Sequence, residues 1–170
     1  MPEYFELVDD AGRVVGRATR KECHANPALV HRVAHVLLFN TRGELYLQKR
    51  ASTKDVQPDK WDTSVGGHLA VGEGYDQAAS RELREELGVS GAALEGPLYE
   101  YRMRSAIETE AVRSYRLVYD GPVSPDPVEI AEGRFWSLDE IRARLGSGIF
   151  TPNFEEELGR YLRWTAGLRG

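Results

Sequence analysis

The sequence is poor in cysteine and lacks any long apolar run. Cys23 is the only cysteine among 170 residues, which excludes an internal disulfide and suits a reducing compartment. The longest apolar stretch, residues 33–39, is far too short to cross a bilayer. The first ten residues, MPEYFELVDD, contain neither a basic region nor an apolar one, so nothing in them indicates secretion. We therefore expect a cytoplasmic protein with no membrane partner.

An excess of positive charge is also missing. The chain has 22 lysines and arginines against 27 aspartates and glutamates, a net charge of −5. A non-specific nucleic-acid binder needs a basic face to neutralise phosphates, so we expect no nucleic-acid partner. A length of 170 residues with 41% hydrophobic residues fits a single soluble domain over residues 1–170. The sequence leaves the oligomeric state open.

The most informative stretch is residues 67–89, GHLAVGEGYDQAASRELREELGV. Its second half consists of good helix formers without proline, and Gly88 stands where a helix C-terminus commonly needs a left-handed residue. On a 3.6-residue period, Ala79, Leu83 and Leu87 form one apolar stripe. The pattern predicts an amphipathic helix that buries this stripe.

Three carboxylates lie beside the predicted stripe. Glu82, Glu85 and Glu86 are three and four residues apart, so they project from one arc of the helix. Like charges at this spacing repel one another, and a hard divalent cation with oxygen ligands removes the repulsion. The pattern indicates a Mg²⁺ site, with Mn²⁺ as a substitute. An ordinary acidic helix explains the carboxylates but not the spacings of Gly67, Glu73 and Arg81.

The whole pattern resembles the Nudix box, and every defining position is filled. The resemblance implies an α/β/α sandwich around a mixed β-sheet. It also implies hydrolysis of a phosphoanhydride bond in nucleoside di- or triphosphates or related nucleoside-diphosphate-linked compounds, so the partner is a small-molecule nucleotide. On this resemblance Arg81 pairs with Glu73 as structural support. The implied metal ligands are three carboxylates and one backbone carbonyl, namely Glu82, Glu85, Glu86 and Gly67.

The general base and the phosphate contacts are less determined by the sequence. Glu85 or Glu86 can serve as the base, and so can a carboxylate outside the box. Those outside the box are Glu108, Glu110 and Glu132. Phosphate contacts are expected from a basic strand end and the following loop, Lys49, Arg50 and Lys54. Arg102 and Arg104 are the other basic pair.

The similarity extends beyond the box. The run HRVAHVLLFNTRGELYLQKRASTKDVQPDKWDTSVGGHLAVGE is similar to the isopentenyl-diphosphate-isomerase-like branch of Nudix proteins. The isomerase carries a catalytic cysteine at the position of Gly66, and glycine offers no acid–base group. Isopentenyl-diphosphate isomerase is therefore an alternative. A non-catalytic nucleotide-binding module is another, but loss of box carboxylates would mark it and none is lost.

The same branch implies a second divalent metal site. Its residue types are three imidazoles and two carboxylates, here His24, His31, His68, Glu108 and Glu110. Imidazole and carboxylate together favour transition metals. The alternative is that these residues are surface or hydrogen-bonding groups without a metal.

The remaining pattern predicts alternating hairpins and helices. We expect a hairpin over residues 4–8 and 14–18, and a buried strand over 31–39 that residues 44–50 complete as a second hairpin. A short strand at 61–65 should lead into a tight turn at Gly66 and Gly67. Further strands are expected at 98–104, 112–119 and 133–136. Ser137, in a capping box with Glu140, and then Asn153 should begin two helices.

Overall fold

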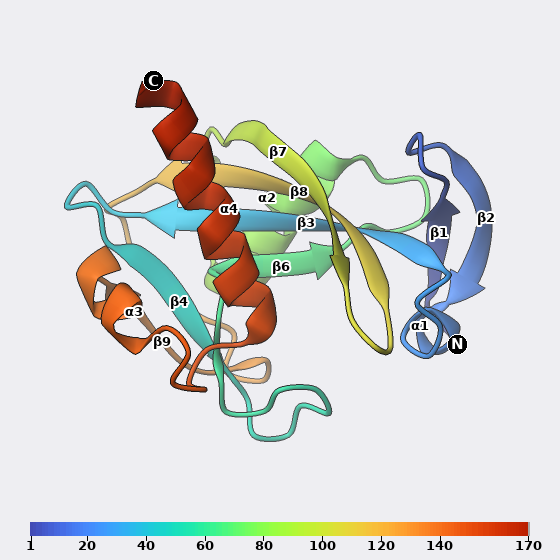
Figure 1. Cartoon of the computed structure of the whole chain (residues 1–170), viewed down its shortest axis with the longest axis horizontal. Coiled ribbons are helices and arrows are strands. Elements are labelled where there is room, and N and C mark those ends of the chain that lie inside the picture. The colour runs from blue at the N-terminus through green and yellow to red at the C-terminus, as the bar shows by residue number, and fades with distance from the viewer. Residues whose placement is uncertain (170) are drawn as a thin grey trace.

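The computed structural model describes residues 1–169 and holds a large mixed β-sheet with helices on both of its faces (Figure 1). The strands are β1 (Tyr4–Val8), β2 (Val14–Thr19), β3 (Val30–Phe39), β4 (Leu45–Arg50), β5 (Trp61–Asp62), β6 (Val65–His68), β7 (Glu95–Arg104), β8 (Thr109–Val118) and β9 (Ile130–Trp136). The helices are α1 (Arg20–Cys23), α2 (Tyr75–Leu87), α3 (Leu138–Arg144) and α4 (Pro152–Arg169).

Strand β3 is the centre of the sheet. It pairs in parallel with β8 along its whole length, from Val30 opposite Thr109 to Phe39 opposite Val118. Its other edge pairs antiparallel with β6, and the hairpin of β1 and β2 joins near His31. Both hydrogen-bonding edges of β3 are thus taken, which decides where the following strand can go.

The expected hairpin of residues 31–39 with 44–50 closes only at its turn. Strand β4 meets β3 at a single pair, Phe39 with Leu45, and then turns away to pair antiparallel with β9. The sequence-based expectation was wrong here because β6 and β8 already occupy the edges of β3. The divergence of β3 and β4 opens the space in which the cavity described below lies.

Alternation along β3 builds the layers. Ala34, Val36 and Leu38 pack in the core under α2, whereas Leu37 and Phe39 pack with α3 and α4 on the opposite face. A strand buried on both faces reads as a nearly continuous apolar run, which is what residues 33–39 show. The predicted α/β/α sandwich around a mixed sheet is confirmed (Figure 1).

Two of the predicted helix ends are confirmed, whereas the last helix, expected to begin at Asn153, begins at Pro152 with Thr151 accepting from the Phe154 N–H. Helix α2 ends at Gly88, whose φ of 68° is left-handed and whose N–H donates to the carbonyl of Arg84. Ala79, Leu83 and Leu87 are all buried. Ser137 caps α3. None of the helices within residues 1–169 is long and apolar enough to cross a membrane.

The expected turn at Gly66 and Gly67 is absent from the described chain. Both residues lie in β6, where Gly66 pairs with His35 and Gly67 with Ala34. They are glycines for a different reason: a side chain at either position meets a neighbour. A Cβ on Gly67 would lie 2.1 Å from Cδ of Glu82, and one on Gly66 would lie 3.2 Å from Cδ2 of His35. The close approach is therefore made by the protein's own side chains.

Candidate active site

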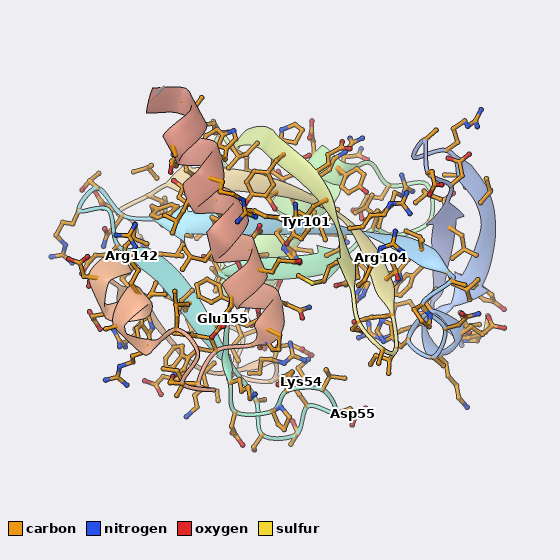
Figure 2. The ribbon with its side chains drawn as sticks, in the orientation of Figure 1. Lys54, Asp55, Tyr101, Arg104, Arg142 and Glu155 are labelled. Carbon is orange, nitrogen blue, oxygen red and sulfur yellow. The ribbon has the colours of Figure 1, made fainter. Side chains whose placement is uncertain are left out.

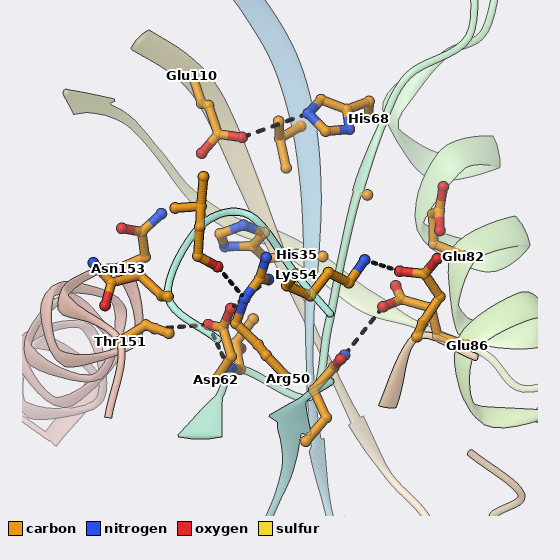
Figure 3. A pocket seen from close by; sticks show the side chains of 18 of the residues that line it. His35, Arg50, Lys54, Asp62, His68, Glu82, Glu86, Glu110, Thr151 and Asn153 are labelled. Atoms are coloured by element: carbon orange, nitrogen blue, oxygen red, sulfur yellow. Dashed lines mark hydrogen bonds and ion pairs between the residues drawn. The ribbon is translucent and has the colours of Figure 1, made fainter. Parts of the chain in front are cut away.

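A polar cavity of about 780 Å³ lies between α2, β3, β4 and the loop of residues 51–60 (Figure 3). Glu82 and Glu86 of α2 line one side, and His68 and Glu110 line another. Lys54 and Asp55 lie on the loop at the cavity's edge (Figure 2). The box carboxylates and most of the residues predicted for a second metal site therefore line the same cavity.

Arg81 connects the box loop to the acidic helix. Its Nε and Nη2 donate to both oxygens of Glu73, at 2.8 and 2.9 Å, in the bidentate geometry that suits guanidinium and carboxylate. Nη2 also donates to the His68 carbonyl at 3.0 Å. Nη1 donates to Glu82 at 2.7 Å and to Glu85 at 3.0 Å. The expected pairing of Arg81 with Glu73 is present, and these bonds hold the pKa of Glu73 below its usual value.

Arg81 reduces the repulsion among the acidic groups but does not cancel it. Its single positive charge is shared by the carboxylates of Glu73, Glu82 and Glu85, and burial still raises the pKa of Glu82. Glu85 lies at the exposed edge of the site, with 53% of its side chain accessible. Glu86 is the carboxylate for which Arg81 provides no ion pair.

Among the carboxylates of the box, Glu86 has the pKa that departs most from its ordinary value. Its Oε1 accepts a hydrogen bond from Nε2 of Gln48 at 3.0 Å, whereas its Oε2 is buried with no partner among the described residues. Burial raises the pKa of Glu86 to about 8, and the charge of Glu82 adds to the shift. A buried, unpartnered carboxylate oxygen fits a ligand for a hard divalent cation.

Gly67 gives Glu82 its place in the site. The hypothetical Cβ of Gly67 overlaps the Glu82 side chain at Cδ, Cγ and Oε1. The missing side chain is thus the cradle in which this carboxylate lies. Mg²⁺ is commonly held by one or two carboxylates together with water and substrate phosphates, so Glu82 and Glu86 suffice as its protein anchors.

The residues predicted for a second metal site come together. The ring nitrogens of His24, His31 and His68 lie within 4.8 Å of one another, and so do ligand atoms of His31, Glu108 and Glu110. Oε2 of Glu108 is 3.2 Å from Nε2 of His24, and Oε2 of Glu110 is 3.8 Å from Nε2 of His31. Phe5 stacks on the rings of His31 and His68 and closes the cluster from one side.

The three histidines are poised as neutral ligands. Burial lowers the pKa of His31 to about 4 and also lowers the pKa of His24. Burial and the neighbouring His31 hold the pKa of His68 well below its usual value. Nε2 of each ring is buried without a hydrogen-bond partner among the described residues. Neutral imidazoles with unused nitrogens fit a transition-metal site.

Two of the three basic residues predicted for phosphate contacts line the cavity. Arg50 donates to the Val56 carbonyl and lies 3.5 Å from Asp62, and Lys54 bonds to Glu129. Lys49 is not among the cavity-lining residues described, because strand alternation turns it away from Gln48 and Arg50. We therefore do not include Lys49 among the phosphate contacts proposed below.

The other candidates also lie outside the cavity lining. Arg102 bonds to the Asp9 carbonyl at 2.7 Å, and Arg104 is an exposed residue of β7 (Figure 2). Glu132 is exposed on β9 opposite Lys49, so it does not fit the role of a general base. Within residues 1–169, the cavity lining includes no phenylalanine, tyrosine or tryptophan.

Sequence reasoning missed three residues that shape the site, Gln48, His35 and Glu157. Gln48 reaches Glu86, and His35 lines the cavity while bonding to the buried Glu157. A signal for His35 was present, because period two places His31, Val33 and His35 on one face of an otherwise apolar strand. Glu157 had no such signal, since its partner is 122 residues away.

Comparison with known proteins agrees with this geometry. The family model described as NUDIX domain matches residues 29–159. The chain is 37% identical to an isopentenyl-diphosphate Delta-isomerase of Nocardia farcinica, over 90% of this chain and 91% of that one. It is 35% identical to an uncharacterized Nudix hydrolase of Streptomyces coelicolor, over 95% and 90%. A crystal structure from Deinococcus radiodurans aligns with a TM-score of 0.80 and 28% identity, covering 94% of this chain and 98% of that one.

Replacing Gly67 with alanine tests the cradle. We expect Gly67→Ala to displace the Glu82 carboxylate and to weaken Mn²⁺ binding by about tenfold to 100-fold, the range found when support of a ligand is lost. Titration followed by electron paramagnetic resonance measures the affinity. Gly16→Ala is the matched control, because a Cβ there meets nothing within 4 Å. Equal Mn²⁺ affinity in both variants would contradict this role for Gly67.

Proposed function

The chain belongs to the NUDIX domain family, and we propose that it is a Mg²⁺-dependent pyrophosphohydrolase acting on a phosphoanhydride bond. Its substrates are nucleoside di- or triphosphates or related nucleoside-diphosphate-linked compounds. The observation that carries this proposal is the unpartnered, buried Oε2 of Glu86 at the wall of a polar cavity, next to the Glu82 carboxylate. Such an arrangement favours a cation and the anionic substrate that binds with it.

Glu82 and Glu86 would hold the ion, with Glu85 at the exposed edge and the Gly67 carbonyl as a further ligand. When bound, Mg²⁺ neutralises and orients phosphate oxygens. The chain's own residues then support the reaction in two ways. Arg81 and Glu73 fix the loop against the helix, and Glu85 or Glu86 accepts the proton of the attacking water. In addition, Arg50 and Lys54 line the cavity and supply positive charge to it.

The composition of the cavity wall bears on the substrate. Without a phenylalanine, tyrosine or tryptophan among its described lining residues, the cavity lacks the large rings on which a base commonly stacks. Thr151 and Asn153, at the start of α4, lie across the cavity from the box carboxylates (Figure 3). Thr151 is buried and its hydroxyl already donates to Asp62. We therefore infer that Asn153 offers the hydrogen bonds that recognise the part of the substrate beyond the phosphates.

The isomerase alternative is disfavoured by two observations, although a relative carries that name. Gly66 has no acid–base group at the position of the isomerase cysteine. The apolar side chains described in the cavity lining are few and scattered, so a prenyl chain gains little from burial there. A non-catalytic module is disfavoured because the box carboxylates are complete and Glu82, Glu85 and Glu86 all line the cavity.

A phosphate-release screen tests the proposal directly. We expect the protein to hydrolyse at least one compound from a panel of nucleoside di- and triphosphates and nucleoside-diphosphate-linked compounds when Mg²⁺ is added, and none with chelator. Isopentenyl diphosphate belongs in the panel, with its isomerisation followed by NMR. Isomerisation without phosphate release would support the alternative, and tight nucleotide binding without turnover would support the non-catalytic module.

Glu86→Gln should lower kcat by about 10²–10⁴-fold, which is the usual contribution of a general base. The loss should be larger if Glu86 also binds the metal. The free energy of unfolding, measured in chelator at pH 8, should not fall. Burial disfavours the ionised carboxylate and raises the pKa of Glu86 to about 8, and the neutral amide of glutamine removes that cost. The control is Glu156→Gln, an exposed carboxylate of α4. Turnover of Glu86→Gln equal to that of the control would show that Glu86 is not part of the site.

We also propose that the histidine cluster holds a second divalent metal, of the transition series. Three neutral imidazoles and two carboxylates come together there, and each imidazole and Glu108 has a buried atom without a hydrogen-bond partner among the described residues. His24, His31 and His68 would be the nitrogen ligands, with Glu108 and Glu110 as the oxygen ligands. When bound, the metal supplies a fixed positive charge at this end of the cavity.

Co²⁺ titration followed by visible absorption tests the second site without an activity assay. We expect saturable absorption bands in the native protein that Glu108→Gln weakens and Glu156→Gln preserves. The low pKa values of the histidines predict binding at pH 7 with little proton release from imidazole. Identical bands in Glu108→Gln and the native protein would remove this carboxylate from the ligand set.

A further inference from the structure

A buried carboxylate outside the box supports the floor of the cavity. Glu157 on α4 is fully buried, and its oxygens accept hydrogen bonds from three side chains. Ser114 Oγ donates to Oε1 at 2.8 Å, Tyr99 hydroxyl donates to Oε2 at 2.7 Å, and Nδ1 of His35 lies 3.2 Å from Oε1. A buried anion is costly without a counter-charge. The ion pair that the described residues give Glu157 is with His35.

This pairing defines the state of the His35 ring. Burial opposes charge on the ring, but the hydrogen bond and the charge of Glu157 outweigh it and raise the pKa of His35. The bonds from His35, Tyr99 and Ser114 keep the pKa of Glu157 low despite burial. Both groups are thus stabilised in their charged forms, and Nδ1–H points at the carboxylate.

The opposite edge of the ring is the one that the cavity can use. His35 lines the same cavity as Glu86 and Gly67 (Figure 3). A Cβ on Gly66 would lie 3.2 Å from Cδ2 and 3.4 Å from Nε2 of His35. Because Gly66 has no side chain, the Cδ2–Nε2 edge is left open at this point of the floor.

We propose that His35 contacts the substrate in the hydrolysis proposed above, its Nε2–H donating a hydrogen bond to an oxygen of the diphosphate. Glu157 is the positioning residue that aims the ring. This inference rests on the proposed function. A donor that is already oriented and charged needs no reorganisation as negative charge develops on the phosphates. It would also explain why glycine at position 66 suits this chain: a larger side chain would cover the donor.

His35→Asn tests the contact while sparing the support. The asparagine amide can still donate to Glu157 in place of Nδ1, but nothing replaces Nε2. We expect kcat/KM to fall about 100-fold, the effect of losing one oriented donor. Inorganic pyrophosphate should bind about tenfold more weakly in calorimetry with Mg²⁺, as expected for a lost charge-assisted hydrogen bond.

Two further variants separate contact from folding. In His35→Gln the amide reaches toward the position of Nε2 and loses the bond to Glu157, so it should recover part of the pyrophosphate affinity even though it is less stable than His35→Asn. Tyr115 lies on β8, next to β3, and Tyr115→Phe loses the part-buried hydrogen bond that its hydroxyl donates to Asp76 of α2. This variant should keep the native kcat/KM. A purely structural role would make activity follow stability in all three variants.

The positioning role of Glu157 has a spectroscopic readout. In the native protein, ¹⁵N NMR should show both ring nitrogens of His35 protonated at neutral pH, with the Nε2 signal shifting on addition of pyrophosphate. Glu157→Gln should convert the ring to the neutral form and weaken pyrophosphate binding. A ring signal that does not respond to either change would overturn the assignment.

The binding and hydrolysis assays fail independently. Equal pyrophosphate affinity in the native protein and His35→Asn, or no binding to the native protein, overturns the role of His35 whatever the hydrolysis screen shows. Pyrophosphate binding that depends on His35, in a protein that releases phosphate from no compound of the panel, keeps the contact and overturns the proposed function.

Discussion

The contact of Arg81 with Glu73, Glu82, Glu85 and the His68 carbonyl sets the geometry of the acidic side of the cavity. Through one planar guanidinium, Arg81 connects the loop that contains Glu73, the end of β6 and helix α2. Because its five donors are fixed in a plane, the groups that accept from them are held at defined positions. Glu86 receives no hydrogen bond from Arg81. It is also the box carboxylate that has a buried oxygen without a partner among the described residues at the cavity wall.

The alternation of side chains along β3 positions the other groups that line the cavity. One face of the strand carries the apolar side chains against which α2 packs, so the position of the acidic helix depends on them. The other face carries His31 and His35, which serve two different parts of the cavity. A single strand thus fixes the distance between the acidic box, the histidine cluster and the ring supported by Glu157. Farther along this second face, Leu37 and Phe39 pack against α3 and α4, so the polar groups occupy only its first half.

Local chemistry made much of the fold readable from the sequence. Helix formers ending at Gly88 define α2, and the capping box of Ser137 with Glu140 defines the start of α3. The resemblance to a family indicated both the ion pair of Arg81 with Glu73 and the histidine cluster. The errors arose where distant strands decide the outcome. Competition for the edges of β3 placed Gly66 and Gly67 in a strand and sent β4 to β9. Strand alternation also places Lys49 on the opposite face from its neighbours Gln48 and Arg50, which line the cavity. The bond between His35 and Glu157 joins residues 122 positions apart, beyond any local pattern.

The central claim is that the box carboxylates bind a divalent ion in the presence of a diphosphate. A crystal structure of the protein grown with Mn²⁺ and inorganic pyrophosphate tests it most directly, since manganese is located by its anomalous scattering. The account predicts an anomalous peak in contact with the carboxylates of Glu82 and Glu86 and with an oxygen of the pyrophosphate. Pyrophosphate bound with no peak beside Glu86, and with Glu82 still bonded only to Arg81, would contradict it.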